Sequence, residues 1–166
     1  MAKDLQKALD NVNITYKELL DIVEDIVNRY SSPIDTIINE VANNIVDLSN
    51  DDIRRLLTEI SFKSYSLGEA KEYSLLKSEV ADALTKEKQA QIFNGSDGTV
   101  DAKKNKALLE SSEEILVNTI YENVSSLLKT KLDEAHRIVS TLTTILTSRN
   151  AEAKLYISLR DDREGF

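Results

Sequence analysis

The stretch from Asp101 to Leu159 constrains the fold more than any other part of the chain. It contains neither proline nor glycine, so nothing in its backbone chemistry forbids one continuous helix. At about 1.5 Å per residue, such a helix would be roughly 85 Å long, which is too long for the core of a compact domain of this size. We therefore expect it to pack against a preceding helix folded back on it, or against another copy of the chain.

Apolar residues in this stretch recur with the alternating spacing of three and four that marks a helix–helix interface. The two interleaved sets are Tyr121, Leu128, Ala135, Leu142, Arg149 and Tyr156, and Val124, Lys131, Ile138, Ile145, Glu152 and Leu159. Most members are apolar. The interruptions at Lys131, Arg149 and Glu152 are polar residues at core positions, which can set the register and oligomeric state of a coiled coil, or they show that the register shifts there.

Composition predicts an all-α protein. The 166 residues include only 4 glycines and 1 proline, and 5% are aromatic, so the chain has little of the turn chemistry that a sheet needs. We expect a long antiparallel helical hairpin, coiled-coil-like, preceded by two shorter N-terminal helices. The expected regions are an acidic helical region over 1–48, the hairpin over 49–160 and a polar tail over 161–166.

Local signals place the boundaries within these regions. An apolar stripe predicts a first helix within residues 4–31, and Ser32 with Pro33 predicts the start of a second helix over about 33–47. Ser49 is expected to cap a third helix that reaches about Phe93. The segment 94–100 contains two glycines, an Asn and an Asp, and is expected to be the loop at the tip of the hairpin.

Charge is distributed unevenly. Residues 1–60 carry 6 Lys and Arg against 12 Asp and Glu, whereas residues 61–166 carry 15 against 17, and the net charge is −8. An acidic chain does not favour nucleic-acid binding, which usually requires a basic surface. There is no cysteine, no apolar run of membrane-spanning length and no signal peptide at the start, so we expect a cytoplasmic protein without disulfides or a membrane partner.

No residue pattern indicates catalysis. His136 is the single histidine, and without a second one the usual zinc sites cannot form. The many adjacent acidic pairs lack a supporting partner for acid–base work, and the loop glycines lack the lysine and strand of a phosphate loop. We expect no enzyme activity, no catalytic residue, no metal, no cofactor and no small-molecule substrate.

The strongest local concentration of positive charge flanks the expected loop. It consists of Lys86, Lys88, Lys103, Lys104 and Lys106. These lysines can contact a nucleic-acid backbone, and Phe93 can stack on an unpaired base. The alternative is that they are solubilising charges, offset by Glu87, Asp97 and Asp101.

The second half resembles the phage recombination mediator proteins of the UvsY type over roughly residues 50–160. The resemblance lies in the segment from Lys86 to Gly95, in the pair Leu127 and Leu128, and in Ser148, Arg149, Lys154 and Arg160 on the long helix. It implies an all-helical, non-enzymatic homo-oligomer in the bacterial host cell. It also implies binding to single-stranded DNA and to a RecA-like recombinase that the protein helps to load, with Lys86 and Lys88 nearest to the family's basic positions.

Residues 50–93 are too few to cover the whole of 101–159, so the end of the long helix is the expected self-association surface unless the N-terminal helices cover it. The expected oligomerisation residues are Leu142, Ile145, Leu146, Arg149 and Tyr156. The acidic N-terminal region departs from the resemblance. The alternative function is therefore an acidic helical adaptor or inhibitor that binds a basic protein partner.

Overall fold

A computed structural model describes residues 17, 20–21 and 23–164, with side chains described as far as Ser158. Over this part of the chain the protein is helical and contains no strand, which confirms the all-α class. The elements are a π-helical turn η1 (Val27–Ser31), α2 (Ser32–Asn44), α3 (Asn50–Gly95), α4 (Val100–Glu110) and α5 (Ser112–Glu164). Most of the first predicted helix, over 4–31, lies outside the described residues.

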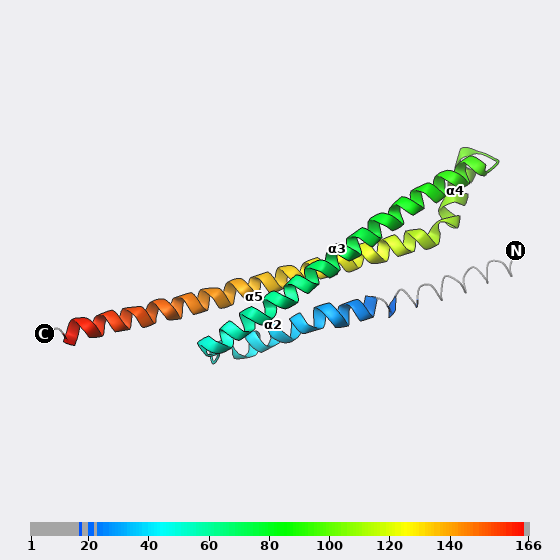
Figure 1. Cartoon of the computed structure of the whole chain (residues 1–166). Coiled ribbons are helices and arrows are strands. Elements are labelled where there is room, and N and C mark those ends of the chain that lie inside the picture. The colour runs from blue at the N-terminus through cyan, green and yellow to red at the C-terminus, as the bar shows by residue number, and fades with distance from the viewer. Residues whose placement is uncertain (1–16, 18–19, 22, 165–166) are drawn as a thin grey trace.

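The two long helices α3 and α5 run antiparallel and form an elongated hairpin (Figure 1). Helix α2 lies against the first part of α3 and the facing part of α5, so one half of the molecule has three helical layers. The main cluster of buried apolar side chains lies in this half. Its members are Ile34, Ile37, Val41, Leu48, Ile53, Leu56, Ile60, Leu67, Val124, Leu128, Ala135 and Leu142.

Helix α3 begins with the predicted cap. The Ser49 hydroxyl accepts a hydrogen bond from the backbone N–H of Asp52, and the Asp52 carboxylate accepts one from the backbone N–H of Ser49, which completes a capping box. The hydrogen bonds from Ser49 lower the pKa of Asp52. This reciprocal arrangement satisfies two backbone donors and fixes the point at which the chain turns from α2 into the hairpin.

Helix α2 begins at Ser32, as Ser32 and Pro33 predicted, but no break in the helical backbone precedes it. Ser31 and Ser32 keep right-handed helical dihedral angles, and the backbone N–H of Ser32 donates to the carbonyl of Val27, five residues back. Pro33 has no N–H and its ring displaces the carbonyl four residues earlier, so the helix widens into a π-type turn before it. The serines and proline therefore mark a bulge in a continuous helix, and α2 ends at Asn44 rather than at about residue 47.

The single helix predicted from Asp101 onward is also interrupted. Ser111 leaves the helical region with φ −103° and ψ 12°, which separates α4 from α5. Its side chain is fully buried, and its hydroxyl donates to the carbonyl of Ala107 and accepts from the Gln89 amide. A serine hydroxyl that competes for helix carbonyls, held in place from α3, accounts for this break without proline or glycine.

Lys131 and Arg149, two charged residues at core positions of α5, connect α5 to α2 and to the turn that follows it. Lys131 Nζ lies 2.8 Å from an oxygen of Asp35 and 2.8 Å from one of Glu134, and these hydrogen bonds raise the pKa of Lys131, the Asp35 bond most. The Arg149 guanidinium donates to the backbone carbonyls of Leu48 and Val46. Beyond Arg149, α5 extends past the start of α3 (Figure 1).

Truncation of Leu128, which is fully buried, is expected to test the core. The change Leu128→Ala should lower the free energy of unfolding by about 2–5 kcal/mol, because it removes buried methyl groups and leaves a cavity. The matched control is Leu76→Ala, since Leu76 is 55% exposed, and it should change stability by less than about 0.5 kcal/mol. Urea denaturation followed by circular dichroism measures both, and equal losses would contradict this assignment of the core.

Candidate functional site

Three of the five predicted DNA-binding lysines at the hairpin tip are engaged by carboxylates of the same chain. The ion pairs are Lys86–Asp82 at 2.5 Å, Lys88–Glu114 at 2.6 Å and Lys106–Glu110 at 3.8 Å. The Lys88–Glu114 pair joins α3 to α5, whereas the other two lie along single helices. Exposed pairs of this kind are weak, so the ammonium groups stay available to a stronger anion, yet each would have to leave its carboxylate.

The remaining predicted tip residues lie together. Lys103 Nζ lies 5.8 Å from the centroid of the Phe93 ring, within the range of a cation–π contact. Phe93 and Lys104 line an open hollow of about 380 Å³ between α3 and α4, together with Ala107 and Leu108. The structure thus brings Phe93, Lys103 and Lys104 into one small cluster, with an aromatic ring and two lysines at the tip of the hairpin.

We name the part of the hairpin between Ser74 and its tip the outer half. Its side chains between α3 and α5 are mainly small or polar, a feature that the sequence analysis missed. There α3 turns Ser74, Ser78, Ala81 and Thr85 toward α5, and all four are buried. The contacts across the hairpin are hydrogen bonds, namely Ser78–Asn118 at 2.6 Å, Gln89–Ser111 at 3.0 Å and Lys77–Tyr121 at 3.2 Å. Small and polar side chains therefore fill the position that large apolar residues occupy in the other half.

Lys77 and Tyr121 form the boundary between the apolar and polar halves. The Lys77 ammonium lies 4.7 Å from the ring centroid of Tyr73 and 4.8 Å from that of Tyr121. Its hydrogen bond to the Tyr121 hydroxyl is the main cause of its raised pKa. The partly buried Lys77 therefore links the buried Tyr121 of α5 to the exposed Tyr73 of α3.

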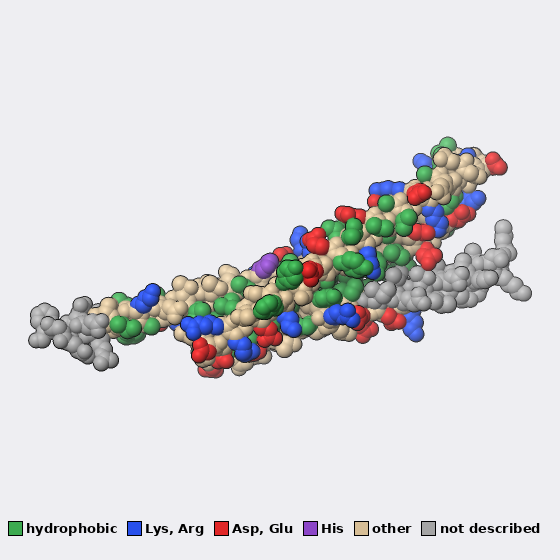
Figure 2. All heavy atoms as spheres, viewed as in Figure 1, with side chains coloured by type: hydrophobic (Ala, Val, Ile, Leu, Met, Phe, Trp, Pro, Cys, Tyr) green, Lys and Arg blue, Asp and Glu red, His purple; other side chains and the backbone are tan. Residues whose placement is uncertain are grey.

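Large apolar side chains lie on the outside of α3 at the same level. We name Tyr73, Leu76, Val80 and Leu84 the outward stripe. Their exposed fractions are 61%, 55%, 52% and 53%, and the spacings of three and four place them on one face of the helix. Figure 2 shows hydrophobic side chains on the outer surface along α3. Within the described part of the chain no element covers this stripe, and exposed apolar patches of this kind are typical of interaction surfaces.

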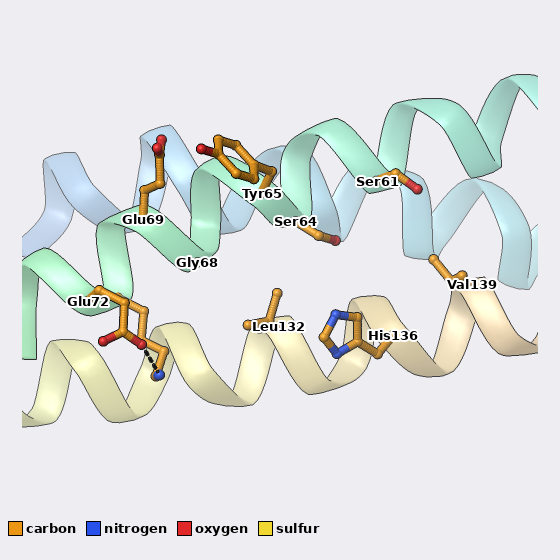
Figure 3. Close-up of a pocket in the computed structure, with 10 residues that line it drawn as sticks. Ser61, Ser64, Tyr65, Gly68, Glu69, Glu72, Leu132, His136 and Val139 are labelled. Atoms are coloured by element: carbon orange, nitrogen blue, oxygen red, sulfur yellow. Dashed lines mark hydrogen bonds and ion pairs between the residues drawn. The ribbon is translucent and has the colours of Figure 1, made fainter.

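A groove of about 780 Å³ separates α3 from α5 in the three-layered half (Figure 3). Ser61, Ser64 and Gly68 of α3 and Leu132 of α5 are among the residues that line it, and the His136 ring points from α5 into it. A Cβ atom added at Gly68 would meet nothing within 4 Å, so the groove has open space beside this residue.

The predicted oligomerisation residues fall into two groups. Leu142 is fully buried, Ile145 and Leu146 pack partly buried against the core, and Arg149 binds the carbonyls that follow α2. In this conformation these side chains serve the chain itself, which is the alternative that the sequence left open. Tyr156 is 74% exposed on the end of α5 that passes beyond the other helices.

Within the described residues no group of three or more His, Asp or Glu side chains could hold a metal ion. None of the helices in this part of the chain combines the length and the apolar character that a bilayer-crossing segment needs.

Comparisons with protein families, with curated proteins and with solved structures found no match to this chain.

The Lys88–Glu114 pair predicts how stability changes with pH. The hydrogen bond that the Glu114 carboxylate accepts from Lys88 is the main cause of the lowered pKa of Glu114 in the folded protein. A lowered carboxyl pKa contributes stability above the ordinary pKa, and this contribution is lost as the pH falls through the folded value. From about pH 5 to about pH 3, the free energy of unfolding should therefore fall more steeply for the wild type than for Glu114→Gln.

The control is Glu113→Gln, which changes an exposed neighbouring carboxylate. Chemical denaturation at several pH values measures the three proteins. Parallel curves for the wild type and Glu114→Gln would show that the Lys88–Glu114 contact contributes nothing to folding.

Proposed function

We propose that this protein is a non-enzymatic helical adaptor whose outward stripe binds an amphipathic helix of a basic protein partner. The observation that carries the proposal is the inverted side-chain pattern in the outer half of the hairpin. Between residues 74 and 85 of α3, the side chains Ser74, Ser78 and Thr85 are buried. In the same stretch Leu76 and Leu84 are more than half exposed. Packing of the hairpin alone does not require leucine or valine on the outside, so these residues suit a contact with another molecule.

Helix-on-helix packing of the coiled-coil kind fits this surface. An amphipathic helix binds through apolar anchors spaced by three and four residues, which is the spacing of the outward stripe. The exposed carboxylates Glu69, Glu72 and Glu79 lie along one edge of α3 beside the stripe. With the net charge of −8, they favour a partner helix whose apolar face is flanked by lysine or arginine.

A designed peptide tests this proposal. A fluorescent helix with leucines at the spacing of the outward stripe and lysines beside them should bind the wild-type protein in an anisotropy titration. The double substitution Leu76→Asp and Val80→Asp should weaken binding at least about 10-fold, because the peptide's apolar face would meet two charges.

The matched control substitutes the exposed residues Leu108→Asp and Leu109→Asp on α4, away from the outward stripe. This variant should bind as the wild type does. A second peptide with glutamates in place of the lysines should bind more weakly. Absence of wild-type binding to the basic peptide, or equal binding to the acidic one, would overturn the adaptor function.

A second candidate function is supported by the cluster of Phe93, Lys103 and Lys104. In this reading the protein is a phage recombination accessory protein. It would act as a cytoplasmic homo-oligomer that binds single-stranded DNA and helps to load a RecA-like recombinase. Aromatic stacking and phosphate contacts are the two elements of sequence-independent single-strand binding. This candidate ranks second because residues 82–114 carry 5 lysines against 7 acidic residues.

The DNA-binding candidate predicts a graded loss. The double change Lys103→Ala and Lys104→Ala should weaken binding to an oligothymidylate more than Lys86→Ala and Lys106→Ala do, because the latter pair is held by Asp82 and Glu110. Filter binding at low salt measures both variants. No retention of the oligonucleotide by the wild-type protein under these conditions would eliminate this candidate.

A further inference from the structure

Among the described residues, no other part of the chain packs against the end of α5. Every side chain from Asn150 to Ser158 is exposed, and these include Leu155, Tyr156 and Ile157 at 60%, 74% and 61%. We name residues 150–164 the free end. An isolated helix of about 15 residues is marginally stable in water, so packing against another surface would stabilise the free end.

The groove between α3 and α5 matches the free end in length. It extends along α5 from Leu132 to Val139, and a second hollow continues it along α3 to Leu57, so on α3 it spans residues 57–72. That span is about 22 Å long, as is the 15-residue free end. The groove floor at Gly68 has open space, and the buried Ser64 hydroxyl has no hydrogen-bond partner among the residues that the structure describes.

One stripe on α5 joins the groove to the free end. Its members, separated alternately by four and three residues, are Leu132, His136, Val139, Thr143, Leu146, Asn150, Ala153 and Ile157. The first three line the groove, and the last three belong to the free end. The unbroken alternation places all eight on one face of the helix, as in a coiled-coil interface.

We propose that the free end of a second copy of this chain fills the α3–α5 groove, with the two α5 helices antiparallel about a twofold axis between Thr143 and Leu146. Such an interface is isologous, so each copy fills the groove of the other and the assembly closes as a dimer. The facing pairs are Leu132 with the partner's Ile157, His136 with the partner's Ala153, Val139 with the partner's Asn150, and Thr143 with the partner's Leu146.

Charges beside the stripe are complementary in this register. Asp133 faces the partner's Lys154, and the twofold axis repeats the pair. On the same edge, Ser140 lies opposite the partner's Thr147. Between residues 132 and 157 no like charges face each other in this pairing, which favours the antiparallel register.

The geometry distinguishes three adjacent exposed residues of the free end. Ile157 belongs to the stripe, whereas Leu155 and Tyr156 precede it by two residues and one, or about 200° and 100° around the helix. The dimer therefore depends on Ile157 and leaves Tyr156 outside the groove. Of these three residues, Tyr156 is the one that the sequence analysis included among the expected oligomerisation residues.

Disulfide trapping tests the register directly, because the chain has no cysteine of its own. The double variant His136→Cys and Ala153→Cys should form a covalent dimer under mild oxidation. Within one helix the two positions are 17 residues, or about 25 Å, apart and cannot be bridged. Each single variant should stay non-covalent, because its cysteine is equally far from its own counterpart in the partner.

A covalent ladder above the dimer would overturn the closed arrangement, since it requires a head-to-tail contact. Failure of the double variant to cross-link would overturn the register.

Analytical ultracentrifugation provides the second test. The wild type should sediment as a dimer of the 18.6 kDa chain. Ile157→Asp should raise the dimer dissociation constant about 100-fold by placing a charge in the groove, and Leu155→Asp should leave it unchanged. Circular dichroism should show that both variants remain helical.

A wild-type monomer, a ring of more copies, or equal effects of the two substitutions would each overturn the proposal. The result is independent of the outward stripe, so failure of peptide binding and failure of dimer formation are separate outcomes.

Discussion

Apolar packing between α3 and α5 holds the rest of the structure in place. Ile53, Ile60 and Leu67 of α3 are fully buried, as are Leu128 and Leu142 of α5. Because each helix is long, this contact also fixes the course of everything beyond it. The hairpin tip is directed away on one side, and the free end of α5 on the other (Figure 1). Burial of large aliphatic side chains supplies the stability that helical propensity alone would not.

The core stops where α3 changes its inner residues from leucine and isoleucine to serine, alanine and threonine. Past Lys77 the two helices are joined by hydrogen bonds such as Ser78–Asn118, which contribute less net stability than apolar burial. The outer hairpin is therefore the more easily perturbed half of the molecule. It also carries the outward stripe and the tip cluster, so both proposed binding surfaces lie on the half with the weaker internal packing.

The two proposed interactions occupy different parts of the same scaffold. The outward stripe begins at Tyr73, whereas the groove ends near Glu72 and uses the small residues Ser61, Ser64 and Gly68. A closed dimer would place two outward stripes and two hairpin tips on one particle, which raises the effective affinity for a partner with repeated sites. Self-association and partner binding are thus compatible by geometry.

The sequence by itself determined the all-α class, the helix cap at Ser49 and the position of the loop, because periodicity and capping are local properties. Local chemistry was misleading at Pro33, where a bulge replaces a break, and at Ser111, where a contact from Gln89 accompanies the end of a helix. The tip cluster was found from sequence, since Phe93, Lys103 and Lys104 flank one loop. Only the tertiary structure decided that Leu142 is internal, that Leu76 is external and that Gly68 faces an open groove. Those assignments depend on which of several apolar faces of a long helix meets its neighbour, and that choice is made by packing across the hairpin rather than by any one segment.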